Sequence, residues 1–157
     1  MKKFILFFAF ISAVASAIAS EIKDLVNDYS QVSEALIAAN PAKANESSKL
    51  FLEHLKQFNM NSLNESQQKS FQKIKPSIEK YLNKISGTNN IEDQRKYFGA
   101  LSPIVWNLVK NSGYQQALYY NYCPMKEFYW ISLENNIRNP YYGSKMLKCG
   151  DLSEKIN

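Results

Sequence analysis

The stretch IEDQRKYFGALSPIVWNLVK, residues 91–110, carries the pattern of an amphipathic helix and stands between two regions of different composition. Its apolar residues recur every three or four positions, a spacing that places their side chains on one face of a helix. Asn90 precedes the pattern with Asp93 three positions later, which is typical of a helix N-terminus. Pro103 should bend this helix or separate its first turns from the rest. The apolar face consists of Ile91, Phe98, Leu101, Val105 and Leu108.

Two similar patterns open the part of the chain before this helix. Apolar residues recur at spacings of three and four over residues 22–39, and Asn40-Pro41 ends that pattern because proline cannot continue the hydrogen-bond ladder. A second helix is predicted from about residue 41 to 58, since proline is accepted in a first turn. The polar stretch 59–64 that follows is predicted to be a loop.

A third helical pattern has its apolar residues between positions 71 and 85. Pro76 lies inside it and should cause a kink or a break without creating two separate packing elements. Gly87 occupies the position of a helix terminator. Four amphipathic segments joined by short loops predict an up-and-down four-helix bundle over about residues 22–110.

After Asn111-Ser112-Gly113 the composition becomes strongly aromatic. Helical periodicity fades, and the β-favouring residues predict short strands around residues 118–123 and 128–133. The fold class is therefore mainly α, with an aromatic, partly β or irregular C-terminal tail over about residues 114–150. Most of the aromatic residues are interpreted as packing groups. They are Tyr114, Tyr119, Tyr120, Tyr122, Phe128, Tyr129, Trp130, Tyr141 and Tyr142.

The N-terminus has the pattern of a secretory signal peptide over residues 1–19. Lys2 and Lys3 precede an apolar run at 4–14, and Ala17-Ile18-Ala19 forms a small-x-small cleavage signal. The run is too short for a stable membrane span, and no cysteine lies near the cleavage point to carry a lipid. We therefore expect a periplasmic or secreted protein with one domain over residues 20–157 and no membrane anchor after cleavage.

Charge and motif content argue against two function classes. The net charge of +5 includes the two lysines of the signal, and the remaining lysines are scattered among acids, so no nucleic-acid partner is predicted. The chain has no C-x-x-C, no C-x-x-C-H and no G-x-S-x-G motif, and its single histidine, His54, is interpreted as structural. The sequence therefore does not predict an enzyme.

The tail holds both cysteines and two of the four methionines, as Cys123, Met125, Met146 and Cys149. Thiolate and thioether sulfur are soft ligands that select Cu(I) among the common biological metals. Cys123 and Met125 share a face if the chain is extended, as Pro124 favours, whereas Met146 and Cys149 share a face in a helical turn. Together the four sulfur atoms predict a metal site.

A disulfide between Cys123 and Cys149 is the alternative, because an even cysteine count in an exported protein usually means a bridge. A loop of this size would stabilise the fold by roughly 3 to 4 kcal/mol in the chain-entropy model. Both interpretations stay open at this point. Met60, which has no sulfur partner, is interpreted as a gap-filling residue, and Trp130 as a core residue that could also shield Cu(I).

The tail also carries a resemblance to a known domain. The segments YCPM (122–125), YWIS (129–132) and IRNPYYGSKMLKCG (137–150) resemble the signature of an uncharacterised helical periplasmic domain. That domain occurs alone or fused to periplasmic adaptor subunits of heavy-metal efflux pumps of the resistance-nodulation-division type. Residues 91–110 are similar to it as well. With no adaptor barrel or hairpin region, this chain would be a stand-alone form.

The resemblance implies a role in copper or silver handling, with Cys123, Met125, Met146 and Cys149 matching the motif. We therefore expect a periplasmic protein that binds Cu(I) or Ag(I), linked to heavy-metal efflux or metal homeostasis, with an efflux adaptor or a metal chaperone as partner. The alternative is a disulfide-stabilised protein-interaction module of the cell envelope with no metal.

Overall fold

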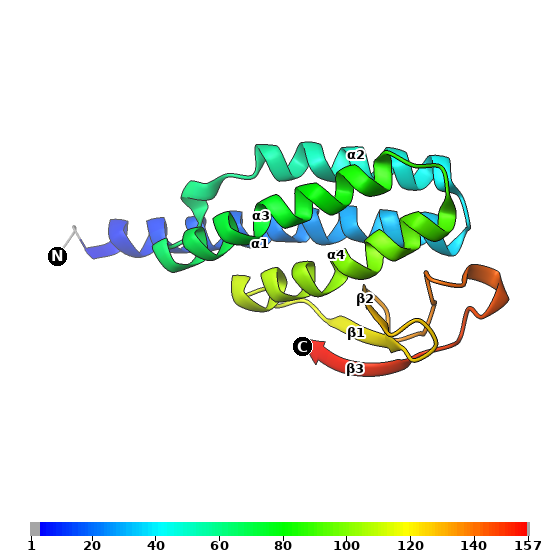
Figure 1. Ribbon diagram of the computed structural model, residues 1–157. Coiled ribbons are helices and arrows are strands. Elements are labelled where there is room, and N and C mark those ends of the chain that lie inside the picture. Colours follow the sequence, from blue (N-terminus) through cyan, green and yellow to red (C-terminus); the bar gives the residue numbers. More distant parts are fainter. Residues whose placement is uncertain (1–3, 157) are drawn as a thin grey trace.

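The computed structural model describes residues 4–156, with side chains from Glu21 onward except that of Ser62. Within that range the chain forms four α-helices followed by a small antiparallel sheet, so the predicted fold class is confirmed (Figure 1). Helices that follow one another in sequence pack side by side, as in an up-and-down bundle. The helices are α1 (Phe4–Ile37), α2 (Pro41–Gln57), α3 (Glu65–Ser86) and α4 (Ile91–Ser112).

Asparagine side chains start three of the four helices. The Oδ1 atom of Asn40 accepts from the backbone N–H of Lys43 at 3.0 Å at the start of α2, and Asn90 does the same for α4. Asn64 forms a reciprocal capping box with Gln67 at the start of α3. Such caps satisfy backbone donors that have no partner within the helix, and each contributes roughly 0.5–2 kcal/mol. They fix the short connections that keep neighbouring helices antiparallel.

Neither internal proline divides its helix. α3 continues through Pro76 and α4 through Pro103, and both rings lie on exposed positions. Buried residues on both sides of each ring, Phe71 and Ile78 in α3, keep the two halves of the helix packed on the same core. Of the two predicted alternatives, a bend or a break, the break does not occur in either helix, because tertiary packing outweighs the lost hydrogen bond.

The first helix is longer than the sequence predicted. α1 begins at Phe4, so it includes most of the segment assigned to the signal peptide, while residues 1–3 lie outside the described residues. Among the residues whose structure is described, no helix combines the length and apolarity needed to cross a membrane. From Ile22 onward α1 contributes to the core.

The core lies between the four helices and extends under the sheet. Its members are almost completely removed from solvent, which is the main source of stability in such a bundle. The largest fully buried side chains are Trp130, Tyr29, Tyr141, Phe51, Phe71, Phe98, Ile22, Leu36, Leu55, Ile78, Leu82 and Ile85.

The sheet has three antiparallel strands in the order β2-β1-β3. β1 (Leu118–Cys123) and β2 (Phe128–Ser132) are the predicted strands, and Cys123 pairs with Phe128 next to the turn that joins them. β3 (Asp151–Ile156) was not predicted, and its partner is the other edge of β1. The tail therefore ends in a strand that returns to the cysteine-bearing strand β1.

The edge of β2 docks onto the bundle through a buried tyrosine. The backbone N–H of Ile131 donates to the Tyr29 hydroxyl at 3.1 Å, and that hydroxyl is also bonded to Ser102 Oγ at 2.7 Å. Gly99 of α4 permits the approach, because a Cβ atom there would lie 2.6 Å from the ring of Phe128. One hydroxyl thus connects α1, α4 and β2.

A buried arginine holds the connection between β2 and β3. Arg95 of α4 donates through Nε to the carbonyl of Pro140 at 2.9 Å and through Nη2 to the carbonyl of Leu36 at 3.1 Å. Its Nη1 donates to Glu92 at 2.8 Å. The residue as a whole is only 7% exposed. Arg95 therefore joins the C-terminal end of α1, helix α4 and the tail at one point.

Candidate functional site

The two cysteines lie side by side where β1 meets β3. Cys123 is the last residue of β1 and is fully buried, whereas Cys149 is partly exposed and precedes β3 by one residue, Gly150. The pairing of Tyr122 with Asp151 brings the two positions together, and both thiols are free. The structure therefore places two of the four predicted sulfur residues, Cys123 and Cys149, next to each other.

The thiol of Cys149 is held in its protonated form by its surroundings. Burial, followed by the charge and the hydrogen bond of Cys123, raises the pKa of Cys149. Two adjacent thiols cannot both ionise easily, because the second negative charge would face the first. A metal ion that binds here would displace these protons, and oxidation to a disulfide would also proceed through the thiolate, which is the reactive and metal-binding form.

Asn139 fixes the loop that carries Cys149. Its Nδ2 donates to the carbonyl of Cys149 at 2.6 Å, and its backbone N–H donates to the carbonyl of Leu147 at 2.8 Å. Its Oδ1 accepts from the backbone N–H of Tyr141 at 2.8 Å. Asn139 is fully buried, so these bonds form away from water. No functional role was predicted for Asn139 from the sequence, so its positioning role was missed.

Gly150 allows the chain to pass under Trp130 directly after Cys149. A Cβ atom on Gly150 would lie 2.5 Å from Cη2 of Trp130 and 2.9 Å from the carbonyl oxygen of Tyr122. Its φ of +147° is also a conformation that residues with a side chain rarely adopt. Trp130 is 1% exposed and is a core residue, as predicted. Glycine is therefore required between the second cysteine and β3.

The two methionines of the tail are surface residues. Met125, in the turn between β1 and β2, is 63% exposed, and Met146, after the 3₁₀ turn Gly143–Lys145, is 38% exposed. The Nζ atom of Lys126, in the turn between β1 and β2, lies 5.2 Å from the centroid of the Tyr142 ring. This turn and the segment that leads to Met146 are therefore neighbours. Gap-filling in the core does not account for these methionines, whereas Met60 packs against the core.

The two methionines of the tail are exposed to solvent, whereas Cys123 is buried. Within residues 4–156, no group of three or more His, Cys, Asp or Glu residues is placed to hold a metal ion. The candidate donor set consists of two adjacent thiols and of the exposed thioethers of Met125 and Met146, which lie two and three residues from them in the sequence. Chemically, such a set suits a soft monovalent ion or a disulfide, and it does not suit zinc or a hard cation.

An aromatic stack links α4 to strands β1 and β2. Trp106 of α4 stacks on Tyr120 at 4.6 Å, Tyr120 on Tyr129 at 4.8 Å, and Tyr129 meets Tyr122 at 4.7 Å between ring centroids. Burial, together with Tyr129 and Glu154, raises the pKa of Tyr120 to about 12. These rings pack between the sheet and α4, which confirms the predicted packing role for this part of the tail.

His54 lies in a different part of the molecule and links two helices. Its Nδ1 is 2.7 Å from Oδ2 of Asp28, which joins α2 to α1. Burial raises the pKa of Asp28, the bond to His54 lowers it, and the neighbouring Asp24 raises it. The pair lines a cleft of about 300 Å³ that also contains Glu21.

The fold and site together define a small helical bundle whose docked sheet carries a pair of adjacent thiols. Residues 25–117 match a family described as "protein of unknown function (DUF3347)", and because the match spans more than half of the chain, the protein belongs to this family. No curated protein and no solved structure matches the chain. The matched region ends before β1, so all four sulfur residues of the tail lie outside it.

Proposed function

We propose that the protein binds Cu(I) or Ag(I), with Cys123 and Cys149 as thiolate ligands and Met125 and Met146 as thioether ligands. The observations that support this proposal are the two adjacent thiols and the exposure of two methionines that follow Cys123 by two residues and precede Cys149 by three, respectively. Exposed methionines contribute little to stability, since their apolar surface stays in water. Soft monovalent ions prefer this combination of ligands.

Binding releases the protons of both thiols, so the apparent affinity rises with pH. Because the pKa of Cys149 lies above its usual 9.0, this dependence covers the neutral range and continues into alkaline pH. Cys123 lies inside the sheet, whereas Met125 and Met146 face the solvent. An ion held this way can pass to an acceptor by stepwise ligand exchange at the methionine side.

The cellular setting of the proposal follows from the sequence. The signal-like residues 1–19 support export to the periplasm, and the resemblance of the tail to a domain found with heavy-metal efflux adaptors supports a partner of that type. A periplasmic efflux adaptor or a metal chaperone would then receive the ion. The family assignment itself contributes only the helical domain.

A second function rests on the same pair of cysteines. Cys123 and Cys149 could form a disulfide that fixes the tail as a docking surface for another envelope protein, with no metal involved. The contact between the thiols favours this function as well, because an exported protein meets an oxidising compartment. The two functions differ in the state of the thiols in the cell.

An anaerobic competition titration of the reduced protein with Cu(I) and a chromogenic chelator tests the first function. We expect one tightly held equivalent, lost in Cys149→Ser while the far-ultraviolet circular dichroism stays unchanged. Met146→Leu should weaken the binding without abolishing it, whereas Met60→Leu, the matched control away from the site, should leave it unchanged. Equal affinity in the wild type and Cys149→Ser would contradict the proposal.

The alternative is tested by counting free thiols in protein taken directly from the envelope. Free thiols in that material exclude the disulfide module. A disulfide combined with no competition for Cu(I) after reduction would exclude the metal site. In that case Cys149→Ser should lower the melting temperature, since the loop-closure stabilisation is lost.

A further inference from the structure

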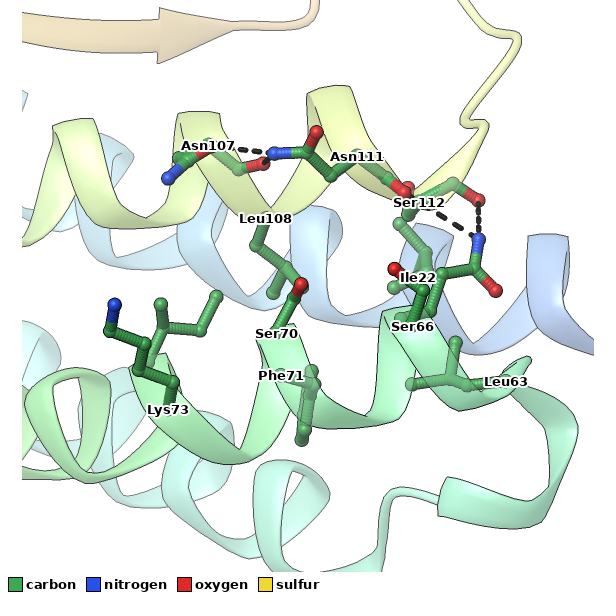
Figure 2. A pocket seen from close by; sticks show the side chains of 12 residues that line it. Ile22, Leu63, Ser66, Ser70, Phe71, Lys73, Asn107, Leu108, Asn111 and Ser112 are labelled. Atoms are coloured by element: carbon green, nitrogen blue, oxygen red, sulfur yellow. Dashed lines mark hydrogen bonds between the residues drawn. The ribbon is translucent and has the colours of Figure 1, made fainter.

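A cleft of about 370 Å³ opens between α3 and α4, on a part of the bundle that the sulfur site does not use (Figure 2). Its floor is apolar and consists of core side chains, with Phe71 and Ile22 each 1% exposed and Leu108 7% exposed. Leu63 and Ile74 complete the floor. A concave apolar surface of this volume falls in the range of small-molecule sites.

The rim of the cleft is polar and carries a single charge. α3 contributes Ser66, Ser70 and Lys73, and α4 contributes Asn107 and Asn111 across the gap (Figure 2). No Asp or Glu is among the residues that line the cleft. Lys73 is therefore the one charged residue among those that line the cleft, and it lies at the edge of an apolar floor.

Several polar atoms of the rim have no hydrogen-bond partner among the residues that the structure describes. In the part of the chain that the structure describes, Ser66, Ser70 and Lys73 make no side-chain hydrogen bond or ion pair. The Nδ2 of Asn111 donates to Oδ1 of Asn107 at 2.6 Å, which leaves Nδ2 of Asn107 as a free donor. These groups are available to a ligand that contacts the floor at the same time.

The cleft has a defined length. At one end Nε2 of Gln67 donates to the carbonyls of Asn111 and Ser112 at 3.5 and 3.4 Å, which connects the two helices. Lys73 lies six residues further along α3, a rise of about 9 Å. A ligand is therefore bounded by a polar contact between the helices at one end and by an ammonium group at the other.

We propose that this cleft binds a small amphiphilic monoanion, with an apolar body on the Phe71–Leu108 floor and one carboxylate at Lys73. The medium-chain fatty acids are the chemical class that fits both features. A cation is disfavoured by the charge of Lys73, and a sugar is disfavoured by the apolar floor. This site is independent of the thiols, so it stands whether or not the protein binds metal.

Octanoate is the probe, and 1-octanol is its uncharged analogue. In a titration followed by backbone amide chemical shifts, octanoate should shift residues 63–74 and 107–112 and leave the tail unchanged. Lys73→Gln should weaken octanoate binding about two- to fivefold, the effect of one exposed ion pair, and should not change the binding of 1-octanol. Lys75→Gln, on the same helix but outside the cleft, should change neither.

A second variant tests the volume of the cleft. Ser70→Phe places a ring in the gap from an exposed position and should abolish the binding of both probes without loss of helicity. The proposal is overturned if the shifts spread over the whole surface, if Lys73→Gln and Lys75→Gln behave alike, or if Ser70→Phe binds octanoate normally.

Discussion

The helical bundle and the tail are stabilised in different ways. The bundle buries a continuous set of large apolar side chains contributed by all four helices. The tail also buries aromatic rings, but its position depends on a few polar contacts, made by Tyr29, Arg95 and Asn139. Apolar packing is spread over many residues, whereas each of these hydrogen bonds is made by one side chain. Single substitutions should therefore affect the stability of the bundle and the attachment of the tail to different extents.

The largest effect is expected for Phe71→Ala in the bundle core. The ring is 1% exposed and stacks on Phe58 at 4.5 Å, so its removal should lower the free energy of unfolding by about 3–5 kcal/mol. Urea denaturation followed by circular dichroism measures this loss. Leu50→Ala, at a 44% exposed position of α2, should cost less than about 0.5 kcal/mol. Similar losses for both variants would argue against the described core.

Arg95→Met should affect the attachment of the tail more than the bundle. The substitution leaves the carbonyls of Pro140 and Leu36 without their donor, and we expect a loss of about 2–3 kcal/mol. Protease cleavage within residues 133–150 should become faster while helicity is retained. Lys96→Met, the exposed neighbour on α4, is the control. If α4 unfolds together with the tail, the two regions are not separable at this point.

Asn139→Ala should have a smaller and more local effect, about 1–2 kcal/mol, because one buried hydrogen-bonding side chain is lost. The hydrogen bond to the carbonyl of Cys149 is lost, so the loop should become more mobile and the two thiols should be in contact for a smaller fraction of the time. The rate at which a Cys123–Cys149 disulfide forms with added oxidised glutathione should fall, whereas Asn135→Ala in the exposed part of the tail should leave it unchanged. An unaltered rate in Asn139→Ala would remove the positioning role.

Asp28→Asn should give the smallest change, less than about 1 kcal/mol, and its sign depends on pH. Because the pKa of Asp28 in the folded protein lies above its usual 3.8, its contribution to stability is greatest below the unfolded pKa and is lost as pH rises through the folded pKa. The amide should therefore stabilise the protein near neutral pH and have no effect at about pH 3. Unfolding measured at both pH values checks this. Destabilisation at neutral pH would mean that the pair with His54 dominates.

The sequence predicted the bundle well because apolar spacing is a local signal. The starts of α2 and α4 agree with the prediction, and Asn90 caps α4 as expected. The sequence left open whether Pro76 and Pro103 bend or break their helices. Neither helix is broken, because the cost of a missing hydrogen bond is local while the packing that opposes it involves the whole helix. Proline position alone did not show whether the rings face solvent.

The tail was predicted less completely. β3 was missed because Asp151–Ile156 has only two apolar residues and is almost entirely exposed, so its structure comes from pairing with β1 and not from its own pattern. That pairing is what brings Cys149 to Cys123. The roles of Asn139 and Arg95 were also missed, because their partners are defined by the tertiary fold.

The positions of the two tryptophans allow the docked sheet to be followed by intrinsic fluorescence. Trp106 stacks parallel to Tyr120 and donates from Nε1 to Glu154 of β3 at 2.9 Å, while Trp130 covers Gly150 next to Cys149. The chain has no other tryptophan. Intrinsic fluorescence should therefore report the seating of β3 through Trp106 and the state of the cysteine loop through Trp130, while helices α1 to α3 contribute no indole emission. In two variants that each keep a single tryptophan, the emission of Trp130 would report metal binding or oxidation at the thiols, and the emission of Trp106 would report the position of β3.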